Sequence, residues 1–223
     1  IQNQPNLKLT TAIKNTSWWK ILLFLVWLYF FGLMLQITLR YIPISSDVSF
    51  LAIKQDEVTT IPSYLTIFYI HVYSAIFTLF FGIVQFIKIT NQQIRKIHRL
   101  FGKFYFYITV LLAAPSGIYI GFYANGELIA QSAFVILGIL WWIFTVIAVV
   151  KIKQKNIQSH RNFMLRSYAL ALSALTLRAW KVILVYLFHP APMDVYQIIA
   201  WLGFVPNLLL VEYYIYKTKQ SKI

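Results

Sequence analysis

The chain has 223 residues, of which 60% are hydrophobic and only 12% are charged, and it contains no cysteine. This polar fraction is too small to cover a soluble globule of that size, so the composition predicts an integral membrane protein. The absence of cysteine excludes disulfides, thiolate metal ligands and iron–sulfur clusters.

Six apolar segments are long enough to cross a bilayer, because a helix needs about twenty apolar residues to span its roughly 30 Å of hydrocarbon. The predicted spans are residues 18–38, 64–88, 103–124, 129–150, 163–187 and 195–216. The first is long enough to be a retained helix rather than a cleaved signal peptide. The sequence therefore predicts an all-α integral membrane protein with six transmembrane helices, in one membrane domain over residues 1–223.

Basic residues are concentrated on one side of the predicted membrane, which holds 16 of the 20 lysines and arginines. They are Lys8, Lys14, Lys20, Lys88, Arg95, Lys96, Arg99, Lys103, Lys151, Lys153, Lys155, Arg161, Arg166, Lys217, Lys219 and Lys222. The positive-inside rule then predicts that both termini are cytoplasmic. The formal charge of +14 is explained by this topology and by anionic phospholipids, so we expect no nucleic-acid partner.

Two of the basic connections end in a similar motif, "HRLFGKFYFY" from His98 and "HRNFMLRSYA" from His160. Each is predicted to be a turn that opens a helix running outward. The pattern predicts two parallel helix-pair repeats that form a four-helix core over residues 64–187, with the first and sixth spans flanking it.

Four stretches, "HVYSAIFTLFFGIVQF", "HRLFGKFY", "SGIYIGFYANG" and "HRNFMLRSYALALSALTLR", lie between His71 and Arg178. Over this range the chain resembles a bacterial membrane-protein family called domain of unknown function 2306. The resemblance implies a location in the bacterial cytoplasmic (inner) membrane and a set of polar positions, but no activity. Those positions are His71, Gln85, His98, Arg99, His160, Arg161, Arg166 and Arg178. At position 103 this chain has lysine where the family pattern more often has arginine. Lysine is less suited than arginine to a bidentate contact with an anion.

Arg178 and His71 are predicted at similar depth, roughly 8 and 10 Å below the outer boundary of the hydrocarbon. A charged group at that depth needs a cavity, a partner or the bundle interior. We therefore expect an outward-facing ligand pocket that contains His71 and Arg178, with Tyr69 and Gln85 as further members. The alternative is that Arg178 reaches the headgroups alongside Lys181 and that His71 bonds a nearby carbonyl.

The histidines suggest a redox function, because haem in a membrane bundle commonly takes histidine ligands from facing helices. His98 and His160 would ligate the iron of haem b. The cofactor's carboxylates would meet the neighbouring cations Arg99, Arg161, Arg166 and Lys103. The same cations could instead bind phospholipid phosphates. A haem-linked or quinone-linked redox protein is thus the leading prediction.

Two other functions stay open. The chain could be a transporter or receptor for a small anionic or quinone-like ligand, with Pro115 kinking the third span and widening a cavity. It could also be an accessory subunit of a larger membrane complex, with its aromatic outer spans facing partner subunits. The single acid within a span, Glu212, is expected to pair with a cytoplasmic arginine. No zinc-hydrolase spacing, phosphate-binding glycine loop or serine-nucleophile motif is present, and enzymatic activity is left undecided.

Overall fold

Helices build almost all of residues 18–220, which the computed structural model describes, and this part of the chain contains no strand. The long helices are α2 (Trp18–Leu39), α4 (Tyr64–Val84), α5 (Gln92–Ile108), α7 (Glu127–Lys153), α8 (Ile157–Ala171), α9 (Ser173–Phe188) and α11 (Val205–Gln220). Five helical stretches are long and apolar enough to cross a membrane, and a sixth is present if the bent pair of α8 and α9 forms one span. The all-α membrane class is thereby confirmed, while the two-repeat layout stays a prediction.

The third span begins earlier than the sequence predicted. α5 starts at Gln92, because the side chain of Asn91 accepts a hydrogen bond from the Ile94 amide at 2.8 Å and caps the helix. Residues 92–101 contain no proline or glycine, so nothing interrupts the helix before the predicted start of the span at residue 103. His98 therefore lies inside α5, as His160 lies inside α8, and the prediction of a turn at each of these positions was wrong.

A π-helical segment, η2 (Thr109–Ala113), joins α5 to α6 (Ala114–Gly121). The Ala114 amide donates to the Thr109 carbonyl instead of to that of Val110, and Pro115 has no amide hydrogen to offer. The Val110 carbonyl thus loses its usual donors, and the indole of Trp142 donates to it at 3.1 Å. A side chain of α7 therefore compensates the irregularity that Pro115 and the π-helix create.

The fifth span is bent by 43° between α8 and α9, rather than forming one straight helix. The side chain of Asn207 in α11 donates to the Ala169 carbonyl at 3.1 Å, just before the bend at Leu172. A partner from outside the helix thus bonds its backbone at the break, as is typical of helix kinks. The sixth span is similarly made of two pieces, α10 (Pro192–Leu202) and α11.

A cap, residues 41–63, covers one end of the bundle with the short helices η1 (Ser49–Ile53) and α3 (Gln55–Thr60). Its centre is Lys54, which is only 2% exposed. The Lys54 ammonium forms an ion pair with Glu57 and donates to the Tyr123 carbonyl at 2.5 Å. The cap is therefore fastened to the connection between α6 and α7.

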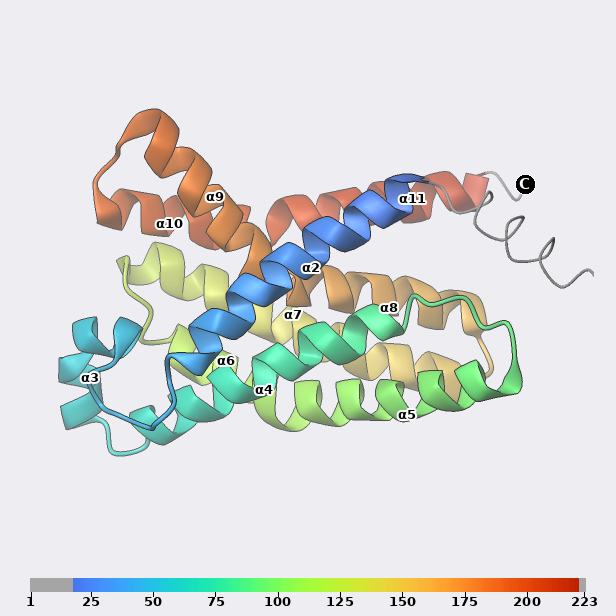
Figure 1. Ribbon diagram of the computed structural model, residues 1–223, viewed down its shortest axis with the longest axis horizontal. Helices are drawn as coiled ribbons and strands as arrows, with labels where there is room; N and C mark the ends of the chain where they lie inside the picture. Colours follow the sequence, from blue (N-terminus) through green and yellow to red (C-terminus); the bar gives the residue numbers. More distant parts are fainter. Residues whose placement is uncertain (1–17, 221–223) are drawn as a thin grey trace, which may run out of the picture.

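The opposite end of the bundle gathers the basic segments. In Figure 1 the cap lies on the left with α3, whereas the start of α2, the connection from α4 to α5 and the end of α11 lie on the right. The connection from α7 to α8 is at that same right-hand end. All four basic segments that the sequence placed together thus share one end, although Lys8, Lys14 and Lys222 fall outside the described residues.

Candidate functional site

A cavity of about 420 Å³ lies among the helices, and its walls are mostly apolar. Eleven of the residues that line it are glycine or alanine. They are Ala75, Ala113, Ala114, Gly117, Gly121, Ala124, Gly138, Ala171, Ala174, Ala200 and Gly203. The volume, the apolar walls and a few polar groups are those of a small-molecule site. Small side chains on several helices leave the space into which a flat ligand would fit.

Small residues at a spacing of four create part of this space. Ala113, Gly117 and Gly121 recur on one face of the helix that passes through η2 and α6. A Cβ atom at Gly117 would lie 2.9 Å from Cε1 of His71. Glycine at 117 is therefore what allows the imidazole ring of α4 to approach α6.

His71 is held in one orientation by its ring nitrogen Nδ1, which lies 3.0 Å from the Ala113 carbonyl oxygen. Because a carbonyl only accepts, Nδ1 carries the proton in this bond. The other nitrogen, Nε2, has no hydrogen-bond partner among residues 18–220. A histidine fixed in this way presents a lone pair on Nε2, the arrangement typical of histidines that ligate a metal.

Arg178 lines the same cavity from α9. Its Nη1 donates to the Ala174 carbonyl at 2.7 Å, and neither ion pair within the described residues includes it. The neighbouring Tyr41 is not a counter-ion, because burial raises the pKa of its phenol and keeps it neutral. A guanidinium that lines a largely apolar cavity without a counter-ion favours an anionic or strongly accepting ligand group.

The other two residues of the predicted pocket lie elsewhere. The Tyr69 hydroxyl donates to the Ser45 carbonyl and accepts from the Ser45 amide, both at 2.9 Å, and so holds the cap. The Gln85 side chain donates to the Phe81 carbonyl at 3.3 Å and lies against Gly102. Neither residue lines the cavity.

His98 lies on α5 and His160 on α8, two helices that both pack against α7. Nδ1 of His160 is 2.8 Å from the Ala148 carbonyl oxygen, so this ring too has Nε2 unbonded. Nδ1 of His98 is buried without any hydrogen-bond partner. The pair lies outside the lining of the cavity. The two histidines are therefore separate from the site formed by His71 and Arg178.

Two of the predicted cofactor cations are engaged with the protein itself. Arg166 binds Glu212 through Nε at 2.5 Å and Nη2 at 2.8 Å, which confirms the expected partner for that acid. Arg161 donates to the Tyr214 hydroxyl at 3.1 Å. Both contacts join α8 to α11, so these cations have a structural role in the packing of the last span.

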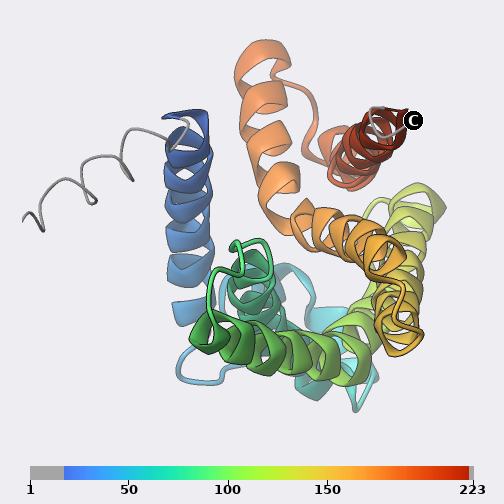
Figure 2. The ribbon, with the colours of Figure 1, turned by 90° about the vertical axis from the view of Figure 1, so that its right-hand side faces the viewer.

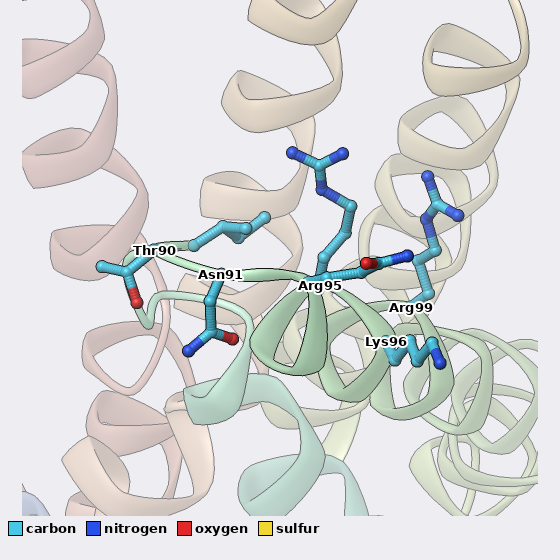
Figure 3. A pocket seen from close by; sticks show the side chains of 7 residues that line it. Thr90, Asn91, Arg95, Lys96 and Arg99 are labelled. Carbon is cyan, nitrogen blue, oxygen red and sulfur yellow. The ribbon is translucent and has the colours of Figure 1, made fainter.

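The remaining predicted cations lie on α5. Arg99 lines a polar hollow at the start of the helix together with Arg95 and Asn91. Figure 3 shows the side chains of Arg95 and Arg99 extending from the helix in the same direction. Lys103, one turn further along, is exposed. This basic hollow is suited to an anionic phospholipid headgroup at the membrane surface.

Within residues 18–220 no three His, Asp or Glu side chains gather in a group that could hold a metal ion. Haem differs from such sites, because the porphyrin supplies four ligands and the protein only one or two. A haem would therefore need only one or two histidines, whereas a bare metal centre would need a larger group of protein ligands.

Sequence reasoning missed the cavity residues Tyr41 and Trp141 and most of the small residues. A signal was available in the spacing Ala113, Gly117, Gly121, because small residues one helical turn apart mark close helix approach in membranes. No sequence pattern indicated Tyr41, because this residue follows α2 and reaches the cavity only through the folding of the cap.

Comparison with known proteins gives a family and no activity. No curated protein and no solved structure matches the chain. A family model described as predicted membrane protein (DUF2306) matches residues 68–215, a stretch that includes His71, both other site histidines and Arg178. Because this match covers more than half of the 223 residues, the chain belongs to that membrane-protein family.

Proposed function

We propose that this protein is a membrane-embedded redox protein that holds haem or a quinone in the cavity between His71 and Arg178. The cavity itself carries the proposal, because it combines about 420 Å³ of largely apolar space with an oriented imidazole and an unpaired guanidinium. The lone pair on Nε2 of His71 suits a haem iron or the hydroxyl of a quinol. The Arg178 guanidinium suits a haem carboxylate or a quinone carbonyl.

The pair of His98 and His160 is a further candidate haem site within the same function. The support for it is that His98 has a buried Nδ1 without a hydrogen-bond partner and that His160 is oriented by the Ala148 carbonyl. A haem there would lie at the end opposite the cap. In the proposed orientation, with both termini in the cytoplasm of a bacterium, this is the inner side of the membrane.

An alternative is a receptor or transporter for a small anionic ligand. The observation that favours it is Arg178, whose charge has no acidic partner within the described residues. Such a ligand would bind in the same cavity, so the two functions differ in the chemistry of the ligand and not in the place.

The first experiment is a visible spectrum of the gently purified protein before and after dithionite, with mass spectrometry of the extracted quinones. A haem in the cavity should disappear in His71→Ala, whereas one between the inner histidines should disappear in His98→Ala and His160→Ala. The amount of quinone that co-purifies should be lower in both His71→Ala and Arg178→Gln. His189→Ala is the matched control, because His189 is exposed at the end of α9 and does not line the cavity.

A featureless spectrum from protein expressed with sufficient haem, together with no co-purifying quinone, would exclude the redox function. Saturable binding of a small anion that depends on Arg178 would then favour the receptor.

A further inference from the structure

We infer that the cavity exchanges its occupant sideways with the lipid bilayer, through the gap between α2 and α9, so that its ligand is a lipid-soluble amphiphile. The inference rests on the proposed function for the site, and adds the route of entry and the class of ligand. Its basis is that packed, buried residues line both ends of the cavity, while one side is bounded by two weakly joined helices.

The cap closes the cavity at one end. Tyr41, Tyr64 and Phe68 line the cavity there and are 5%, 1% and 5% exposed. The ion-paired Lys54 fastens this layer by donating to the carbonyl of Tyr123, which also lines the cavity. A ligand that entered through the cap would therefore have to displace a packed aromatic layer and a buried lysine.

The bundle core closes the other end. Leu79 and Leu170 line the cavity there and are each 1% exposed. The Tyr168 hydroxyl donates to the Leu79 carbonyl at 3.1 Å and accepts from the Trp27 indole at 2.9 Å. The Trp141 indole donates to the Tyr105 hydroxyl at 3.1 Å. These bonds join several helices beneath the cavity, so packed and hydrogen-bonded side chains separate it from the basic end.

The side between α2 and α9 is different. Met34, Ile37 and Thr38 line the cavity from α2, and Leu177 and Arg178 line it from α9. No hydrogen bond or ion pair joins these two helices within residues 18–220, and they touch at only a few points. In Figure 2 the two helices face each other with no other helix between them.

The surroundings of this gap are mostly apolar, with one exposed cation, Lys181 on α9, at the wall of the cavity. Leu35 on α2 and Val182 on α9 are 40% and 70% exposed, as expected of side chains that contact lipid. A head group at His71 and Arg178 would leave its hydrocarbon tail between Met34 and Leu177, where the tail stays in an apolar environment throughout. Entry from the bilayer thus avoids the desolvation that entry through either closed end would require.

The test measures exchange of two lipid-soluble probes, a decyl-substituted benzoquinone and palmitate, in protein reconstituted in nanodiscs. Bound unlabelled probe is replaced by its deuterated form and followed by mass spectrometry. Met34→Trp places a large side chain in the gap and should slow exchange by about tenfold or more. Leu33→Trp is the matched control, because Leu33 is 37% exposed on the same helix and does not line the cavity.

Ile37→Trp is a second obstruction, used if Met34→Trp does not fold, and Lys54→Ala loosens the cap. Slower exchange in the gap variants, with an unchanged rate in Lys54→Ala, supports lateral entry. Unchanged exchange in both gap variants, or faster exchange in Lys54→Ala alone, overturns it even when the quinone binds and the redox function stands. If palmitate binds and is slowed by the gap variants while the quinone does not bind, lateral entry holds and the quinone is excluded.

Discussion

At the scale of single residues, the site depends on one glycine. The imidazole of His71 occupies the space that a side chain at position 117 would fill, because a Cβ there would be 2.9 Å from Cε1. The same contact leaves Nδ1 of His71 3.0 Å from the Ala113 carbonyl oxygen, one turn before Gly117. The position and the orientation of the histidine therefore depend on the absence of a side chain at 117.

Gly117→Ala should displace the His71 ring and destabilise the protein by about 1–3 kcal/mol, the usual cost of overpacking a filled core. Thermal unfolding in detergent measures the stability, and the amount of bound haem or quinone measures the site. Gly32→Ala is the matched control, because a Cβ at Gly32 in α2 has nothing within 4 Å. Equal stability and equal ligand content in the two variants would contradict this account of the site.

At the scale of elements, the helix through α5, η2 and α6 is regular at both ends and irregular where it passes the cavity. The π-helical segment Thr109–Ala113 includes the carbonyl that orients His71, and the small residues of α6 follow directly. Because of this irregularity the Val110 carbonyl has no backbone donor, and the indole of Trp142 donates to it instead. A side chain of α7 therefore supports the geometry of the site.

Trp142→Phe should destabilise the fold by about 1–3 kcal/mol, because it leaves the Val110 carbonyl without a donor in a region where lipid can supply none. Trp19→Phe provides the comparison, since Trp19 on α2 is 56% exposed and its indole makes no hydrogen bond to the described chain. The measurement is the midpoint of thermal unfolding of both variants in the same detergent. A loss of stability that is no larger for Trp142 than for Trp19 would show that the carbonyl is satisfied in another way.

At the scale of the whole molecule, the two ends of the bundle differ in charge and in construction. One end has the cap, with its buried aromatic residues and Lys54, and the other has the basic connections, the hollow lined by Arg95 and Arg99, and the Arg166–Glu212 ion pair. The gap between α2 and α9 lies along the side, between these ends. This layout suits a protein whose ligand enters from the membrane.

A reporter enzyme that is active only outside the cytoplasm should be inactive when fused after Gln220 and active when inserted at Ser46, which is exposed in the cap. The reason is the positive-inside rule, because the basic connections lie at the end where α11 terminates. Activity assayed in intact cells decides the orientation. The reverse pattern would place the cap in the cytoplasm and exchange the inner and outer sides of the site.

The sequence by itself determined the membrane class, the approximate spans and the gathering of basic segments at one end, because these follow from hydropathy and charge summed over many residues. It also indicated Arg178 and His71, because ionisable groups at membrane depth are costly unless they face a partner or a cavity.

Tertiary structure decided which polar residues meet. Gln85 and Tyr69 have the same polar character in the sequence, yet packing turns them towards Gly102 and Ser45 and away from the cavity. The bend at Leu172 and the contact of Trp142 with the Val110 carbonyl likewise depend on side chains of other helices. Hydropathy averages over a segment, whereas a cavity depends on which individual side chains meet across helices, and only the packed structure contains that information.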